Sequence, residues 1–412
     1  MAKNSTSMTL KNTSIEYFAT LPVIFLTTFN RGASFFMHGL VDYHHQVSTT
    51  PFIFPLLNII SENTSSNDMR DPAWISALQL FMQEKLDNEK CSFNLEDFSK
   101  HYLEFLSKHE FENTAKSIFY AAHYAWSMLN NQEIGRLKVI FWHPHHHNED
   151  YENFTANVLK CKLLFLSKDP REALVSAYRY WESSEGMTLL PPSETSYLYD
   201  DLIFYYISSS LDNYAFYLKN KSASLVIKTE QMNNEPESTI REMANFMNIQ
   251  VTQDMFSSTF LGQDKSSHST RGLRGFDKKI NDERWHGELS NFVITFLELI
   301  HYDYMKEFGY SPKIVVNRKE LITYKGNVLR ALTRFPRSMR VTMLENAKND
   351  AGLEIGKHFH PKFKKLEILL RLLRKYSLLC SRCKNIYKHF RRGYKTQLLS
   401  TKNRFNRKQE YT

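Results

Sequence analysis

The most informative part of the sequence is residues 22–36, which read Pro22-Val23-Ile24-Phe25-Leu26-Thr27-Thr28-Phe29-Asn30-Arg31-Gly32-Ala33-Ser34-Phe35-Phe36. The apolar run at its start predicts a buried strand. The small, turn-tolerant residues that follow predict a break, and the apolar spacing at Phe36, Leu40 and Val41 then predicts a helix. A strand, a tight turn and a helix N-terminus direct backbone N–H groups and the positive end of a helix dipole to one place.

Two side chains in this turn suit a negatively charged ligand. Arg31 adds a fixed positive charge, and Ser34 adds a hydroxyl at the start of the predicted helix. The turn therefore predicts a cradle for an anion such as phosphate or sulfate. Taken alone, the same residues also fit an ordinary strand-to-helix turn with a surface arginine.

The composition indicates an ordered protein with few cysteines. The 412 residues are 42% hydrophobic, enough for one large core or two ordinary ones, and 14% aromatic, which argues against disorder. The four cysteines form no disulfide framework, so a reducing compartment is expected. No signal peptide is evident and the first apolar run is too short to span a bilayer. We therefore expect a cytoplasmic protein, with peripheral contact to a membrane as an extension of that expectation.

Four apolar runs predict strands, at residues 22–28, 137–142, 162–166 and 224–228. Residues 70–130 are predicted to be helical throughout, as an insertion that covers the sheet. Strands that alternate with helices predict an α/β fold with a parallel sheet covered on both faces. Ligands of such sheets bind at the carboxyl ends of the strands.

Several histidines follow the second predicted strand: His143, Pro144 and then His145, His146 and His147. Neighbouring side chains of an extended chain point in opposite directions, so this run cannot supply three ligands to one metal ion without a sharp bend. A metal site is therefore the weakest interpretation, and we predict none. A solvated loop and a single histidine acting as a general base at the sheet edge remain.

A second turn of the same design follows the third predicted strand. Asp169 suits a helix N-cap, Pro170 suits the first helical position, and Glu172 suits the acid of a capping box. Lys168 stands directly before this helix and Ser176 lies in its second turn. Two such turns on neighbouring strands suit a ligand with two separated anionic groups.

These motifs resemble, in the same order, those of sulfotransferases that use 3′-phosphoadenosine 5′-phosphosulfate (PAPS). Residues 31–35 resemble the family's 5′-phosphosulfate loop, and Lys168-Asp169-Pro170 with Ser176 is similar to its 3′-phosphate motif. The similarity covers roughly residues 20–312. Its later parts are Glu230, Pro236, Phe246-Met247-Asn248-Ile249, Phe260-Leu261-Gly262, Arg284-Trp285 and Phe308-Gly309-Tyr310.

The resemblance implies a P-loop-like three-layer sandwich with a central parallel sheet, and an enzyme that moves a sulfuryl group from PAPS to an acceptor hydroxyl. It implies that His143 is the base, with His145 in reserve, and that 3′-phosphoadenosine 5′-phosphate (PAP) is the product. Lys168 and Ser176 would bind the 3′-phosphate. The implied residues of the 5′-phosphosulfate site are Arg31, Gly32, Ala33, Ser34 and Phe35.

The sequence departs from the family pattern at four positions. Ala33 replaces a glycine, Phe35 replaces a hydroxyl residue, Lys168 replaces an arginine and Thr229 replaces a tyrosine. The alternative interpretation is therefore a catalytically degenerate protein of this fold that serves as a nucleotide-binding or membrane-associated scaffold. We favour an active enzyme because positive charge is kept at both anion sites. A P-loop kinase is disfavoured because the sequence has no Gly-x-x-x-x-Gly-Lys-Ser/Thr motif.

Charge is unevenly distributed along the chain. Residues 313–412 hold 26 Lys and Arg but 6 Asp and Glu, a net charge of +20. The rest holds the other 27 of the 53 basic residues and 38 of the 44 acidic ones, a net charge of −11. An acidic body with a basic extension predicts separate tasks for the two parts.

Within this extension, residues 364–383 place leucine and isoleucine on one arc with lysine and arginine on its flanks. The pattern is typical of a helix that lies on an anionic membrane surface, and the predicted contact spans residues 364–395. Nucleic-acid binding is disfavoured because no recognised module accompanies the charge. A solvated helix, or one that packs against another subunit, explains the pattern equally well.

The predicted organisation is a lead-in at residues 1–20, a sulfotransferase domain at 21–312 with its helical insertion at about 70–130, and a basic helical extension at 313–412. The expected partner is an acceptor small molecule, a glycan or a lipid. A carbohydrate or lipid hydroxyl is favoured by the basic extension and by the aromatic-rich residues 196–217, whose rings suit stacking on sugars. The oligomeric state is left open.

Overall fold

The computed structural model describes residues 14–29, 31–50, 54, 56, 57, 59, 70, 72–88, 94–144, 154–184, 198–264, 275–278, 283–289, 294, 297, 298 and 301–313. The chain divides into two compact units. The first contains the residues up to 188 and residues 209–288, and the second contains residues 189–208 and those from 289 onward.

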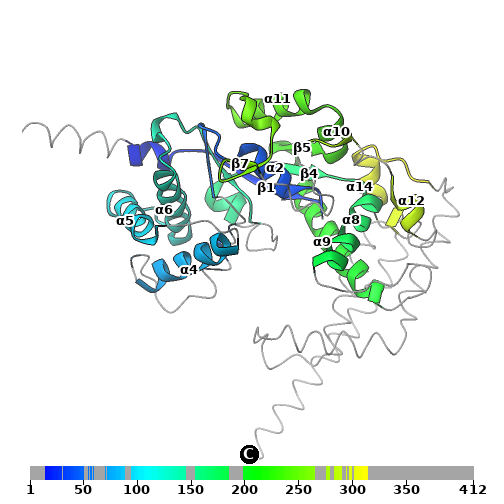
Figure 1. The fold of residues 1–412 in the computed structure, drawn as a ribbon, viewed down its shortest axis with the longest axis horizontal. Helices are drawn as coiled ribbons and strands as arrows, with labels where there is room; N and C mark the ends of the chain where they lie inside the picture. Colours follow the sequence, from blue (N-terminus) through cyan, green and yellow to red (C-terminus); the bar gives the residue numbers. More distant parts are fainter. Residues whose placement is uncertain are drawn as a thin grey trace, which may run out of the picture. The chain divides into compact units, whose positions relative to one another are not determined.

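A five-stranded, fully parallel sheet forms the centre of the first unit (Figure 1). Its strands are β1 (Val23–Thr28), β2 (Val47–Thr49), β3 (Val139–Trp142), β4 (Lys162–Ser167) and β5 (Ser224–Lys228). They lie in the order β2-β3-β1-β4-β5. Because β1 is central, the turn after it lies between the segments that follow β3 and β4.

The α/β fold class and all four predicted strands are confirmed. The fifth strand, β2, was missed in the sequence because it has only three residues, two of them Ser48 and Thr49. It pairs with β3, with Val47 opposite Val139. A strand this short and polar lacks the apolar run by which strands are recognised, so tertiary pairing alone reveals it.

Helices cover both faces of the sheet, which gives the predicted three layers. On one face lie α2 (Ser34–Val41), α10 (Thr229–Asn234) and α11 (Pro236–Met247), and their apolar side chains form one core with the strands. The strand residues of this core alternate along the chain, as a pleated sheet requires. They are Ile24, Leu26, Val139, Phe141, Leu164, Leu166 and Ile227.

The opposite face carries the intervening strand residues and is aromatic. Phe25 of β1 packs edge-on against Phe216 of α9 (Leu198–Asn220), with ring centroids 5.7 Å apart. Trp142 of β3 packs in the same way against Phe119 of α6 (Thr114–Leu129) at 5.1 Å. Edge-to-face pairs of this kind are the favoured arrangement of buried aromatic rings.

The predicted helical insertion is three helices: α4 (Pro72–Asn88), α5 (Leu95–Lys108) and α6. The side chain of Asn94 caps α5 by accepting from the backbone N–H groups of Glu96 and Asp97. The helix then buries its apolar stripe, Phe98, Tyr102 and Phe105, at 0% exposure. In turn, α6 joins the sheet, because the hydroxyls of its Ser127 and of Ser48 in β2 lie 2.8 Å apart.

The end of the predicted lead-in is docked on this insertion. Residues 14–19 are helical, and the fully buried ring of Phe18 packs at 5.4 Å from Tyr124 and 6.4 Å from Phe105. The Tyr17 hydroxyl donates to the carbonyl oxygen of Leu137. The residues just before β1 therefore belong to the folded body.

Other elements of the first unit are α8 (Pro170–Ser184), which follows β4, the hairpin of β6 (Thr259–Phe260) and β7 (Gln263–Asp264), and α12 (Trp285–Glu288). Short helical turns lie at Ile134–Arg136, Phe154–Leu159, Lys221–Ala223 and Gln253–Phe256. In the second unit, α14 (Tyr302–Glu307) is followed by Gly309 at φ 67°, a left-handed conformation that suits glycine after a helix. Helix α9 begins in the second unit and ends in the first.

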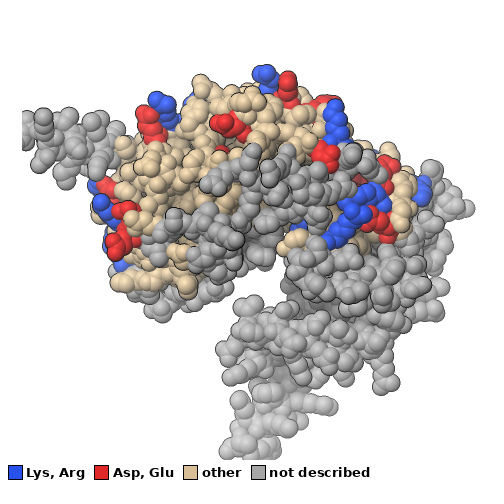
Figure 2. All heavy atoms as spheres, in the orientation of Figure 1, with Lys and Arg blue, Asp and Glu red and all other residues tan. Residues whose placement is uncertain are grey.

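On the face seen in Figure 2, the described surface carries basic and acidic side chains beside one another, with neutral surface between them. None of the described helices is both long and apolar enough to span a membrane. The predicted basic extension, including residues 364–395, lies outside the described residues.

Candidate active site

Four chain segments meet at the carboxyl edge of the sheet, because their strands are parallel and adjacent. His143 follows β3, residues 31–34 follow β1, Lys168 follows β4 and Thr229 follows β5. The fold therefore brings together the predicted base and both predicted anion turns.

The turn after β1 is held against its neighbours. The backbone N–H of Phe29 donates to the carbonyl oxygen of Leu166 at 2.8 Å. Thr229, where the family pattern has tyrosine, places its hydroxyl 3.1 Å from the carbonyl oxygens of both Gly32 and Ser167. The substituted threonine thus ties together the ends of three strands.

Backbone conformation in this turn leaves the start of α2 open. Arg31 and Ala33 have φ values of 60° and 64°, in the left-handed region. Ala33 is the N-cap of α2 and provides no side-chain hydrogen bond to it. The N-cap side chain therefore supplies no cap to the first-turn N–H groups, which suits a place where an anion is to bind.

Gly32 and Ala33 give opposite predictions for single substitutions. A Cβ at Gly32 would overlap Oγ1 of Thr28 and lie 2.8 Å from the carbonyl oxygen of Phe29. We expect Gly32→Ala to lower the free energy of unfolding by about 1–3 kcal/mol through overpacking. Ala33→Gly, which removes a left-handed alanine, should be neutral or stabilise by about 1 kcal/mol. Urea denaturation of both variants tests this, and equal destabilisation would contradict it.

Arg31 lies in the turn with its guanidinium over the ring of Tyr180 in α8, 4.2 Å from the ring centroid. Burial lowers the pKa of Arg31, an effect that Tyr180 opposes. Arginine nevertheless keeps its charge, because its ordinary pKa is so high. Tyr180 thus orients a desolvated cation beside the open start of α2, a contact that sequence reading did not identify.

The N-terminus of α8, in the turn after β4, has the predicted N-cap residue but not the predicted capping box. Asp169 is the N-cap of α8: its Oδ1 accepts from the backbone N–H of Arg171 at 2.9 Å. The predicted capping box is wrong, because Glu172 forms an ion pair with Arg284 instead. The backbone N–H of Asp169 donates to Glu230 at 2.9 Å, so a carboxylate far away in the sequence takes the place of Glu172.

Lys168 is only 3% exposed. Burial lowers its pKa to about 8, with Glu172 and Glu230 opposing the shift and Arg284 and Arg31 adding to it. Arg31 and Lys168 follow the neighbouring strands β1 and β4, so the two predicted anion turns lie side by side at the sheet edge. Ser176, predicted for the same site, is half-buried in the second turn of α8.

His143 is 1% exposed and lies between two residues of α2. Its ring is edge-on to that of Phe35 at 5.5 Å, and its Nδ1 lies 3.3 Å from Nδ1 of His38. Phe35 is 37% exposed, so its ring forms a partly exposed wall beside the predicted base. The reserve candidate, His145, lies outside the described residues.

His38 was missed as a functional residue, although it lies one helical turn after Ser34 and so on the same side of α2. Its Nε2 lies 2.8 Å from the carbonyl oxygen of Thr50. A third histidine, His123 of α6, is also fully buried and close enough to His38 to interact electrostatically. Within the described part of the chain, no cluster of three or more potential ligands is arranged to hold a metal ion.

His123 is enclosed by apolar rings, with Phe119 at 4.6 Å and Phe54 at 5.8 Å. Among the described residues, neither of its ring nitrogens has a hydrogen-bond partner. Burial, with a contribution from His38, lowers its pKa to about 3. A neutral ring without hydrogen bonds in such surroundings destabilises the fold.

We expect His123→Leu to raise the free energy of unfolding at pH 7 by about 1–2 kcal/mol, because it removes that polar group. Below the ordinary pKa of 6.5, His123 is protonated in the unfolded chain. In the folded protein it stays neutral until the pH approaches its own pKa of about 3. Wild-type stability therefore falls as the pH falls through this window, by about 1.4 kcal/mol per unit for this group. Denaturation at pH 7, 6 and 5 should therefore show a smaller decrease in the free energy of unfolding for His123→Leu than for the wild type. An equal decrease in both proteins would refute this prediction.

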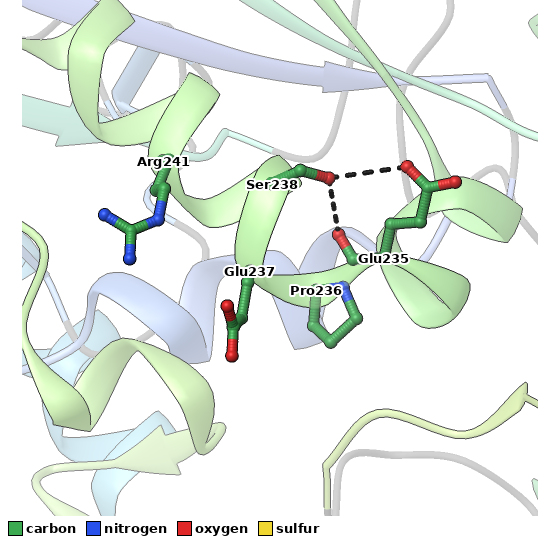
Figure 3. Close-up of a pocket in the computed structure, with 5 residues that line it drawn as sticks. All are labelled: Glu235, Pro236, Glu237, Ser238 and Arg241. Carbon is green, nitrogen blue, oxygen red and sulfur yellow. Dashed lines mark hydrogen bonds between the residues drawn. The ribbon is translucent and has the colours of Figure 1, made fainter.

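A surface pocket lies at the start of α11 (Figure 3). It is lined by Glu235, Pro236, Glu237, Ser238 and Arg241. The Ser238 hydroxyl lies 3.1 Å from the carbonyl oxygen of Glu235. Two carboxylates beside one guanidinium do not suit a ligand with several negative charges, and none of the predicted site residues lines this pocket.

Comparison with known proteins identifies the family of the chain. The family model described as sulfotransferase domain matches residues 73–309, more than half of the chain. The chain therefore belongs to the sulfotransferase family, and the fold and family predicted from the sequence are confirmed. Its reaction is accordingly the transfer of a sulfuryl group. The matched part begins after β1, so the roles of residues 31–35 stay predictions.

Solved structures with similarity to the chain include three sulfotransferases. The sulfotransferase domain from the curacin biosynthetic pathway has 14% identity and a TM-score of 0.42, with 71% of this chain and 99% of that one covered. The sulfotransferase domain of the Synechococcus PCC 7002 olefin synthase has 12% identity, coverage of 71% and 95%, and a TM-score of 0.40. Sulfotransferase STF9 from Mycobacterium avium has 13% identity, coverage of 70% and 77%, and a TM-score of 0.34. No curated protein sequence matches the chain.

Proposed function

We propose that the sulfuryl donor is PAPS and that the acceptor is a hydroxyl group, deprotonated by His143. The observation that carries this proposal is the placement of Arg31 and Lys168, in two different strand-to-helix turns, after the neighbouring parallel strands β1 and β4. A donor with a 5′-phosphosulfate and a separate 3′-phosphate matches two adjacent cationic turns, whereas a single phosphate needs only one. The uncapped start of α2 fits the same ligand.

Each residue then has a definite task. Arg31, Ser34 and the N–H groups of Gly32, Ala33 and Phe35 bind the 5′-phosphosulfate, and Arg31 stabilises negative charge on the leaving phosphate oxygen. Lys168 and Ser176 bind the 3′-phosphate. The donor supplies the sulfuryl group, and His143, on the neighbouring strand, takes the proton of the acceptor hydroxyl.

We further propose a carbohydrate or lipid hydroxyl as the acceptor, near a membrane surface that residues 364–395 contact. The charge and apolar arc of that segment support this part, together with the aromatic-rich residues 196–217. Transfer to small phenols without any transfer to glycans or glycolipids would contradict it.

The decisive experiment is thermal denaturation of the full chain with PAP, and with AMP and ATP as controls. A ligand that binds the folded state alone raises stability by mass action, by about 2.7 kcal/mol at a hundred times its dissociation constant. We expect PAP to raise the melting temperature and AMP to raise it far less, because AMP lacks the 3′-phosphate. No shift with any nucleotide would support the degenerate scaffold, and a shift with Mg-ATP alone would support a kinase.

A further inference from the structure

Two buried histidines face each other through the same ring atom. Nδ1 of His38, in α2, lies 3.3 Å from Nδ1 of His143, beyond β3, and the two residues are 5% and 1% exposed. In a hydrogen bond between two imidazoles, one nitrogen must carry the hydrogen and the other must offer a lone pair. The tautomer of one ring therefore determines the tautomer of the other.

The partner of Nε2, the other ring nitrogen of His38, indicates which ring donates in the hydrogen bond between the two Nδ1 atoms. Nε2 lies 2.8 Å from the carbonyl oxygen of Thr50, which has no hydrogen and can only accept. Nε2 of His38 must therefore carry a hydrogen. The Thr49 hydroxyl, 3.2 Å from the same nitrogen, donates its own hydrogen to the carbonyl oxygen of Thr50 at 3.1 Å. Its lone pairs are then free to face the N–H of His38.

The charge state of His38 follows from its surroundings. Burial lowers its pKa, and this outweighs the opposing effects of Asp42 on the same helix and of the Thr50 carbonyl. Among the described residues, the other titratable groups that face it are His143, which follows β3, and His123 of α6, and neither adds negative charge. A neutral His38 with its hydrogen on Nε2 has a lone pair on Nδ1.

We propose that His38 is a positioning residue that holds His143 in the tautomer with hydrogen on Nδ1, so that Nε2 of His143 is the basic atom. This rests on the proposed function, in which His143 is the base. The proton of the acceptor hydroxyl passes to Nε2, and the ring then carries two N–H groups and one positive charge. Its Nδ1–H continues to donate to His38, so the ring keeps its orientation through the proton transfer.

The tautomer can be read directly from the full chain without substrate. In ¹⁵N-histidine NMR, protonated and unprotonated ring nitrogens have well-separated shifts, and the signal that disappears in His143→Gln belongs to His143. We expect an unprotonated Nε2 and a protonated Nδ1 at pH 7.5 in the wild type. The opposite pattern, or a His143 signal unchanged in His38→Leu, would overturn the proposal.

Two polar variants separate positioning from packing. His38→Asn keeps an acceptor near the place of Nδ1, whereas His38→Gln keeps a donor near the place of Nε2 but loses that acceptor. We expect His38→Gln and His38→Leu to lower kcat by about 10- to 100-fold, part of what a general base contributes, with PAP affinity unchanged. His38→Asn should stay within a few-fold of the wild type. Equal losses in Asn and Gln variants of matched stability would indicate a packing role and reject the proposal.

Failure of this inference can be told apart from failure of the proposed function. Unchanged transfer by His143→Gln would refute His143 as the base. The NMR pattern in His38→Leu would still show whether His38 selects the tautomer of His143. If the wild-type protein does not bind PAP, the assignment of PAPS as the donor is rejected.

Discussion

Arg31→Ala is expected to lower kcat for sulfuryl transfer by about 1,000-fold, the loss typical of removing one group that stabilises charge in a transition state. The guanidinium is held over Tyr180, beside the uncapped start of α2 and within electrostatic reach of Lys168. The fold should survive, because the turn is held by Gly32 and Thr229 rather than by this side chain. Transfer of labelled sulfate from PAPS, together with the melting temperature, measures both effects.

Two further variants make this test specific. Arg31→Lys keeps the charge but loses the planar fork and its stacking on Tyr180, so it should recover only part of the activity. Arg136→Ala removes an exposed guanidinium before β3, at the opposite edge of the sheet, and should leave kcat unchanged. Full activity in Arg31→Ala would refute the assignment of the donor loop.

Lys168→Met is expected to weaken PAP binding by about 10- to 100-fold, because a charge-assisted hydrogen bond contributes about 1.5–3 kcal/mol. Methionine has a similar length and no charge, so the change isolates the ammonium group. AMP affinity should change little, since AMP lacks the phosphate that Lys168 is proposed to bind. Calorimetric titration with both nucleotides gives the comparison, and equal losses for PAP and AMP would contradict the 3′-phosphate role.

The lowered pKa of Lys168 adds a dependence on pH. Its folded value is about 8 rather than 10.5, so the ammonium of the ligand-free protein is half deprotonated near pH 8 and mostly deprotonated above pH 9. PAP affinity should therefore fall as the pH rises from 8 to 9.5, by up to about tenfold per unit for one proton. Lys168→Arg, with a guanidinium that stays charged, should remove this fall. A flat wild-type profile over the same range would show that the lysine keeps its proton.

The sequence determined the fold class through patterns that act locally. Apolar runs predicted β1, β3, β4 and β5. Two apolar stripes, one with Trp74 and Leu78 and the other with Phe98 and Tyr102, match helices α4 and α5 of the helical insertion. Asp169 and Pro170 marked the start of α8, because capping depends on residues within one turn. These signals needed no knowledge of distant contacts, so they could be read directly.

Tertiary structure alone decided the contacts between residues far apart in the chain. Glu172 was predicted to cap its own helix, but it pairs with Arg284, and Glu230 takes its place. The strand β2 forms only because β3 lies beside it. Nothing local distinguishes these outcomes, since each depends on which groups the folded chain brings within hydrogen-bond distance.

The same division applies to the site. The placement of Arg31, Lys168 and His143 at one edge of the sheet was predictable from the sequence, because each follows a strand of the parallel sheet. The orientation of these groups was not, because Tyr180 under Arg31 and His38 beside His143 come from other elements. Residue types and their spacing are properties of the sequence itself. Distances, burial and the resulting pKa values exist only after distant segments have packed, because desolvation and charge interaction depend on what surrounds a group in space.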